Sequence, residues 1–93
     1  MAIAIRFSLH NAQSGHYDAL THLFVCLGWH PARPNTHYQF PPANAPTPLD
    51  MMGHGQIAVQ AFNNYMAGIA AEGVSVASFS MVFDEDLPYN AIW

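Results

Sequence analysis

Histidine is the residue type in this sequence with the widest capacity for chemistry. The chain of 93 residues has six histidines, and His10, His16 and His22 follow one another at intervals of six. This spacing matches neither the H-x₃₋₅-H nor the H-E-x-x-H pattern of zinc sites. On a helix, six residues turn through about 600°, so His16 and His22 would point about 120° apart. We therefore expect no metal site, and no sequence pattern indicates another cofactor.

Gly53-His54-Gly55 is the best single candidate for a ligand site. Glycines allow the backbone to approach a ligand closely, and a helix N-terminus offers N–H donors to an anion. His54 could add a hydrogen bond or a proton transfer near neutral pH. The alternative is a flexible helix start whose donors are capped by Asp50 or by the preceding loop.

A proline-rich segment, residues 30–53, leads to this helix start, and the stretch Trp29–Phe40 would form a pocket together with Gly53–Gly55. Its six prolines forbid a helix, and a loop of this length in a compact domain is either disordered or functional. Arg33 is the expected contact for an anionic group. The predicted ligand-binding residues are Trp29, His30, Arg33, Tyr38, Gly53, His54 and Gly55.

Patterns for covalent or acid–base catalysis are weak. The sequence has no nucleophile elbow and no dinucleotide or P-loop glycine pattern, so an enzyme would depend on His54 or His30 as general acid or base. Asp18 and His22 stand at helical i, i+4 spacing and are predicted to form a solvated pair. Cys26 falls within an apolar helical pattern, which predicts a buried, inert thiol and, as the single cysteine, a reducing cytoplasmic location.

The composition indicates a self-associating protein. It is 52% hydrophobic and only 9% charged, which suggests that a second copy covers part of the apolar surface. The chain has no lysine, and its two arginines, Arg6 and Arg33, are too few for binding to a nucleic-acid backbone. No window approaches the ~20 apolar residues of a membrane span, and the N-terminus lacks the features of a signal peptide. We therefore expect a soluble homodimer with neither a nucleic-acid nor a membrane partner.

The hydrophobic periodicity predicts five elements in one domain, residues 1–93. Residues 2–9 and 74–83 alternate like strands, and residues 36–40 form a shorter strand. Ser14 is the expected N-cap of one helix, which ends near Gly28. Asp50 is the expected N-cap of a second, which ends before Gly73, the expected left-handed residue after it. The order β-α-β-α-β predicts an α+β domain in which two helices cover one face of a small sheet, a ferredoxin-like arrangement or a truncated variant. The predicted core consists of Ile3, Ile5, Phe7, Leu20, Phe24, Leu27, Ile57, Phe62, Tyr65 and Ile69.

Three functions are compatible with these patterns. The first is a small homodimeric binding module of unknown ligand, and the second is a minimal histidine-dependent enzyme. The third is a protein-binding accessory or inhibitor factor, of the phage or mobile-element type, that acts through the acidic and aromatic tail, residues 84–93. The apolar end of that tail, with Ile92 and Trp93, predicts that it is docked and contributes to the dimer.

Overall fold

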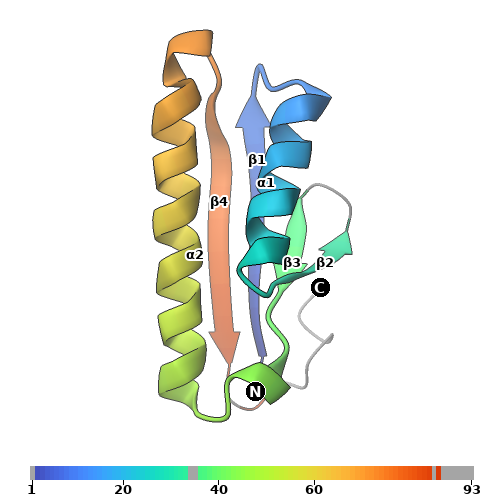
Figure 1. The fold of residues 1–93 in the computed structure, drawn as a ribbon, viewed down its shortest axis with the longest axis vertical. Helices are drawn as coiled ribbons and strands as arrows, with labels where there is room; N and C mark the ends of the chain where they lie inside the picture. Colours follow the sequence, from blue (N-terminus) through green and yellow to red (C-terminus); the bar gives the residue numbers. More distant parts are fainter. Residues whose placement is uncertain (1, 34–35, 85, 87–93) are drawn as a thin grey trace.

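The computed structural model describes residues 2–33, 36–84 and 86, and they form a small α+β domain. The chain runs in the order β1 (Ala2–His10), α1 (Ser14–Cys26), β2 (His30–Arg33), β3 (His37–Gln39), α2 (Pro48–Ile69) and β4 (Ser75–Asp84) (Figure 1). Short 3₁₀ turns precede and follow α2, at Pro42–Asn44 and Ala70–Glu72.

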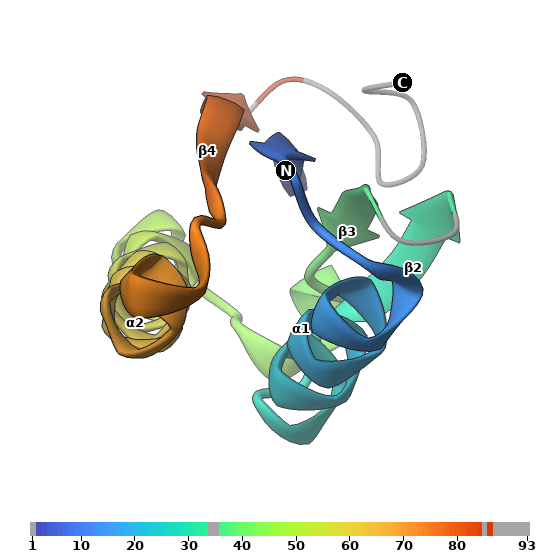
Figure 2. The ribbon, with the colours of Figure 1, turned by 90° about the horizontal axis from the view of Figure 1, so that it is seen from above.

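The four strands form one antiparallel sheet in the order β2-β3-β1-β4. Both helices cover the same face of this sheet, with α2 beneath β4 (Figure 2). The predicted α+β class is therefore confirmed. The predicted order of elements lacks β2, which the proline-rich segment contributes. Pro31 is compatible with a strand there because β2 lies at the edge of the sheet, where a missing N–H is tolerated.

Both helices begin one or more residues earlier than the sequence pattern predicted. Gln13 rather than Ser14 is the N-cap of α1, and it forms a reciprocal capping box with His16. Thr47 rather than Asp50 caps α2, with its hydroxyl accepting from the Asp50 N–H at 3.1 Å. The proline that follows Thr47 suits the first helical position, where no N–H is needed. Gly73 ends the helical segment with φ of 81°, as predicted.

An aromatic cluster forms the centre of the core between the helices and the sheet. The Phe7 ring lies 5.1 Å from Phe62, 5.9 Å from Phe24 and 5.9 Å from Tyr38, measured between centroids. These rings come from β1, α1, β3 and α2, so the cluster joins both helices to the central strands. Such ring pairs stabilise a core by about 0.5–1.5 kcal/mol each beyond simple burial.

Ile57 was predicted to lie in the core, and this prediction is wrong because the side chain is 52% exposed. On α2 the buried row contains Ala58, Phe62 and Met66. The neighbouring row, which contains Ile57 and Tyr65, is rotated by about 100° and turns partly toward solvent. Two apolar rows on one helix give the same periodicity, so the pattern mixed the two: Phe62 and Ile69 are buried as predicted, whereas Ile57 is not.

The predictions for Cys26 and its neighbours on α1 also need correction. Cys26 is exposed rather than buried, and its Sγ lies 3.5 Å from Nε2 of His22. His22 therefore contacts the thiol one turn later rather than Asp18 one turn earlier. Cys26 lies two residues after the buried Phe24, about 200° further around the helix axis, so it belongs to the outward face of α1.

Two further expectations concern the membrane and the tail. Among the described residues, no helix has the length and apolar content needed to cross a bilayer. The predicted docking of Ile92 and Trp93 falls outside the described residues and stays a prediction.

Candidate ligand-binding site

Two of the predicted pocket residues, Trp29 and Tyr38, lie in the core. Trp29 is buried and packs edge-on against Phe40, with 5.5 Å between the ring centroids. Tyr38 is also buried, and its hydroxyl forms a 2.7 Å hydrogen bond with Thr21. Burial raises the pKa of Tyr38 above its usual value; the Thr21 hydrogen bond opposes this rise and the Asp18 charge adds to it. That these rings line a pocket stays a prediction.

The structure brings His54 close to Trp29 through a third ring. The His54 imidazole stacks on Phe40 at 4.1 Å, and Phe40 in turn contacts Trp29. The two glycines beside His54 differ in their surroundings. A Cβ at Gly53 would meet open space, whereas one at Gly55 would approach Ile3 Cδ1 to 2.8 Å. Gly55 therefore permits close packing of α2 on β1.

His30 and Arg33 lie on β2. His30 is exposed and pairs with Gln39, and Arg33 pairs with His37. The pairing of Arg33 with His37 continues across the sheet, because His37 pairs with Arg6 on β1 and Arg6 pairs with Ser80 on β4. The backbone register thus places Arg33, His37, Arg6 and Ser80 in one row across all four strands. This row contains both arginines of the chain.

A hollow of about 270 Å³ lies beside this row. Its lining consists of Arg6, Phe7, Ser8, Thr36, His37 and Ser78. Because side chains alternate along a strand and Phe7 packs toward the helices, Arg6 and Ser8 belong to the opposite, helix-free face of the sheet. The hollow is open to solvent, and its volume matches a small ligand.

Hydrogen bonds fix the polar groups of this hollow. The hydroxyls of Ser8 and Ser78 lie 2.7 Å apart, and the Thr36 hydroxyl lies 2.7 Å from Nδ1 of His37. The Phe7 N–H donates to the Thr36 carbonyl at 3.1 Å, which holds the turn before β3 against β1. The hollow therefore combines a guanidinium, an imidazole and three hydroxyls held by the sheet.

Gln39, two residues after His37 on β3, has a buried polar side chain. Its side chain is 4% exposed, and its Oε1 atom has no hydrogen-bond partner among the described residues. A buried polar atom without a partner costs about 1–3 kcal/mol. Gln39 follows His37 by two residues on β3, so both side chains belong to the helix-free face.

None of the residues that line this hollow was predicted as a site residue; the predicted Arg33 belongs to the same backbone row but not to the lining. The alternation of β1 places Arg6 and Ser8 together on the face opposite Phe7. Nothing local indicated Ser78, because it is seventy residues from Ser8 in the sequence. Only the register between β1 and β4 brings the two hydroxyls together.

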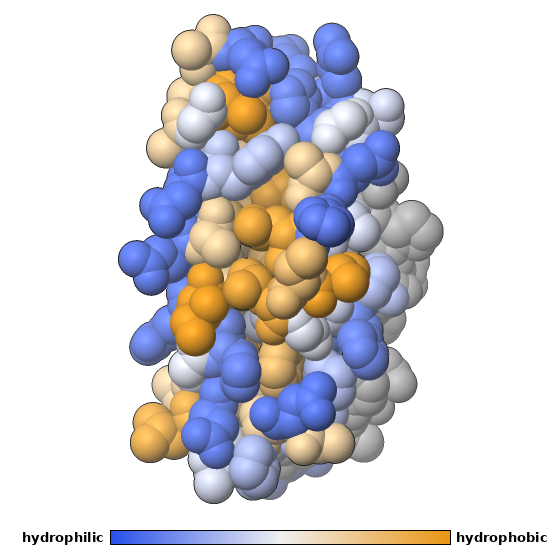
Figure 3. Space-filling model, in the orientation of Figure 1, coloured by the Kyte–Doolittle hydropathy of each residue, from blue (hydrophilic) through white to orange (hydrophobic). Residues whose placement is uncertain are grey.

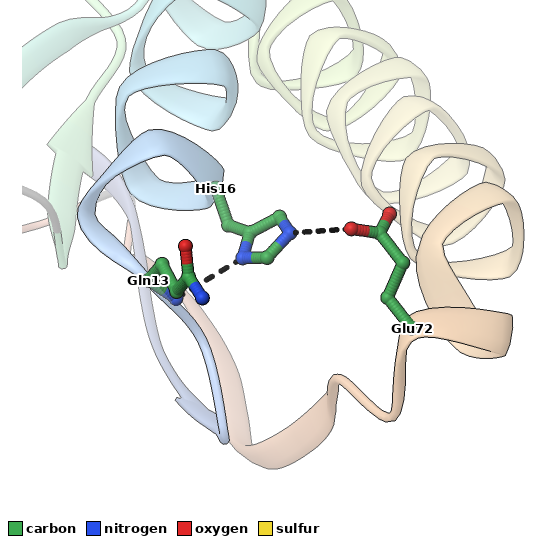
Figure 4. Close-up of polar contacts among 3 residues, drawn as sticks. All are labelled: Gln13, His16 and Glu72. Atoms are coloured by element: carbon green, nitrogen blue, oxygen red, sulfur yellow. Dashed lines mark hydrogen bonds and ion pairs between the residues drawn. The ribbon is translucent and has the colours of Figure 1, made fainter.

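A second polar cluster joins the start of α1 to the turn after α2 (Figure 4). The Gln13 N–H donates to Nδ1 of His16 at 3.1 Å, and Nε2 of His16 lies 3.4 Å from Oε1 of Glu72. An accepting Nδ1 places the proton of a neutral imidazole on Nε2, where it can point at Glu72. This arrangement closes the capping box and ties the two helical segments together. Within the described residues, no group of three or more His, Cys, Asp or Glu side chains could hold a metal ion.

Comparison of the chain with protein-family models, with curated protein sequences and with solved structures gives no match.

Proposed function

We propose that this protein is a small binding domain that takes a small anionic molecule, carrying a carboxylate or phosphate group, on the helix-free face of its sheet. The observation that carries the proposal is that Arg6 and His37, which pair across β1 and β3, both line the hollow of an otherwise acidic chain. The formal charge of the chain is −4 with neutral histidines, so this local concentration of basic residues runs against the overall charge. An anion is the ligand class that such a cluster favours.

The chemistry of the lining supports the same ligand class. The Arg6 guanidinium offers paired N–H donors that match a carboxylate or a phosphate. Of the paired Ser8 and Ser78 hydroxyls, one donates to the other, which leaves one O–H for a ligand oxygen, and the Thr36 O–H can donate to a ligand when Nδ1 of His37 carries the proton. A volume of about 270 Å³ is near the lower end for small-molecule sites, so the ligand is expected to be small.

The experiment is a titration with inorganic phosphate and, separately, with succinate, followed by the amide shifts of the ¹⁵N-labelled protein. We expect progressive shifts centred on Ser8, Thr36, His37 and Ser78. Arg6→Gln should reduce the affinity for either probe by at least about tenfold, since one charge-assisted contact contributes about 1.5–3 kcal/mol. His10→Gln changes an exposed residue at the end of the same strand, outside the hollow, and serves as the matched control.

Three outcomes of the titration are distinguishable. Shifts in the hollow that Arg6→Gln abolishes and His10→Gln retains would support the proposed site. Shifts centred instead on Gly53, His54 and Trp29 would move the ligand site to the pocket predicted from sequence. No shift in either region with both probes in excess would refute binding of a small anion.

We further propose that the arrangement is a ferredoxin-like one. The elements follow each other as β-α-β-β-α-β, which is the split βαβ order of that fold. In support, β3 lies between the two strands of the first βαβ half, β1 and β2. In the same way, β1 lies between the two strands of the second half, β3 and β4.

A further inference from the structure

The last strand of the sheet, β4, is a long edge strand. It pairs with β1 over most of its length and occupies one end of the order β2-β3-β1-β4. Within the part of the chain that the structure describes, no other strand pairs with it. Val76, Met81 and Val82 on this strand are 40%, 40% and 37% exposed. A strand in this position presents a row of backbone N–H and C=O groups that a further strand can bind.

The sequence of β4 lacks the usual protection of such an edge. From Ser75 to Phe83 it has no charged residue and no proline, and the first charge comes at Asp84, its last residue. Edge strands of monomeric proteins are typically short, or they carry lysines, prolines or inward charges that prevent pairing. A bulge does occur where the register changes from Ser8↔Ser78 to Leu9↔Val76, and it leaves residues 78–84 as an uninterrupted strand.

We propose that β4 pairs with β4 of a second copy of this chain, antiparallel and about a two-fold axis, so that two four-stranded sheets become one of eight strands. A two-fold axis requires a strand that complements itself, and it makes the pairing of the two β4 strands antiparallel. An uncharged strand opposite its own copy brings no like charges together. The other edge, β2, is only four residues long and contains Pro31, so it is the poorer template.

The surroundings of β4 fit this partner. Helix α2 lies beneath β4 on one face of the sheet, so pairing of the two edges also brings two α2 helices onto the same side (Figure 2). Figure 3 shows that apolar side chains gather over the middle of this helix and between the two helices. The exposed Ile57 and Met52 belong to α2 and supply apolar surface to that side. The low charge of the whole chain, 9% of its residues, is consistent with such association.

Symmetry gives this proposal a sharp test. In a two-fold antiparallel pair, one residue of β4 lies opposite its own copy, and every other residue lies opposite a different one. Single cysteines are introduced at each position from Ser78 to Phe83 in a Cys26→Ser background, which removes the exposed native thiol. Under mild oxidation we expect one position to form an intermolecular disulfide efficiently and its neighbours on the strand to form far less. Ala19→Cys, at an exposed position of α1, is the control and should remain uncrosslinked.

A second measurement does not depend on cysteine chemistry. Light scattering should give the mass of a dimer for the unmodified chain at tens of micromolar concentration. Val82→Lys places a charge on the paired edge and should raise the dissociation constant at least about tenfold. Val25→Lys, at a similarly exposed valine of α1, should leave it unchanged. Circular dichroism establishes that both variants are folded.

Three results would overturn the proposal. One is a monomer mass for the unmodified chain, and another is crosslinking that is uniform along β4 or equal at Ala19→Cys. The third is a dimer that Val25→Lys disrupts while Val82→Lys does not, which would place the interface on the helices.

Discussion

The imidazole of His54 lies against the ring of Phe40, with 4.1 Å between the centroids and 21° between the planes. Phe40 follows β3, and its N–H donates to the Ile3 carbonyl at 3.3 Å, so the stack joins the second turn of α2 to the central strands. Phe40 also packs edge-on against Trp29. His54 was predicted as a ligand residue, and the structure gives it a packing contact as well.

This stack predicts the effect of removing the imidazole. His54→Ala should lower the free energy of unfolding by about 1 kcal/mol, because an aromatic pair contributes about 0.5–1.5 kcal/mol. His54→Phe should retain most of the stability. Urea unfolding followed by circular dichroism measures both. His10→Ala, at an exposed site without a ring contact among the described residues, is the control and should change stability by less than about 0.5 kcal/mol. Equal effects of His54→Ala and His10→Ala would contradict the role assigned to the stack.

Phe24 and Ile57 give a direct comparison between a buried and an exposed apolar residue. Phe24 is fully buried, and its ring lies 4.6 Å from that of Tyr38. Phe24→Ala should cost about 3–5 kcal/mol, which is enough to unfold a marginally stable domain. Ile57→Ala should cost less than about 1 kcal/mol, because the side chain is 52% exposed. If the two substitutions had similar effects on the denaturation midpoint, the packing of α1 and α2 described here would be wrong.

The error at Ile57 shows what periodicity can predict in this chain. The alternation of β1 and β4 and the glycine after α2 are local signals, and the structure follows them closely. The choice between the rows of Ile57 and Ala58 on α2 depends on which row meets β1 and β4, and a helical period does not contain that information. The same limit applies to β2, whose four residues form a strand because β3 lies beside them.

The candidate site was harder to predict for a related reason. The sequence identified the two arginines and placed one of them, Arg33, in a binding site. Arg33 does not line the hollow, and the residues that line it come together through pairing between β1, β3 and β4. Ser8 and Ser78 are ordinary polar residues in strand patterns, and neither carries a motif. Their role follows from the register of strands that are far apart in sequence.

The burial of Tyr38 predicts a pH dependence of stability. Burial raises the pKa of the Tyr38 phenol, so ionisation is less favourable in the folded protein than in the unfolded chain. The stabilisation is therefore complete below the unfolded pKa, about 10, and is lost as pH rises through the higher folded pKa. Unfolding by urea between pH 8 and 11 should show stability decreasing at the alkaline end. In Tyr38→Phe, the part of this decrease that belongs to Tyr38 should be absent.

Removing Thr21 tests its hydrogen bond with Tyr38. The Thr21 hydrogen bond lowers the pKa of Tyr38, so Thr21→Val should raise it further. The variant also leaves the buried phenol without its partner, at a cost of about 1–3 kcal/mol. In the double variant Thr21→Val with Tyr38→Phe, much of this cost should disappear, because both polar groups are gone. Ultraviolet titration of the tyrosinates, with Tyr38→Phe as the reference, measures the pKa. Additive effects of the two substitutions would contradict the hydrogen bond.

The glycines of α2 provide the last prediction, since they are chemically identical and differ only in their surroundings. An added Cβ at Gly55 would lie 2.8 Å from Ile3 Cδ1 and 2.9 Å from Met81 Sδ, whereas one at Gly68 would meet nothing within 4 Å. Ile3 is buried in the core and has little room to move, although the exposed Met81 can shift aside. Gly55→Ala should therefore destabilise the protein by about 1–2 kcal/mol through overpacking.

Gly68→Ala should have the opposite sign. Alanine in a helix interior is favoured over glycine by about 0.5–1 kcal/mol, and nothing opposes the new methyl group at this position. Thermal and urea unfolding of the two variants, measured side by side, separate the packing effect from the helix propensity that both share. Stabilisation by Gly55→Ala equal to that of Gly68→Ala would mean that α2 does not approach β1 and β4 as closely as the structure places it.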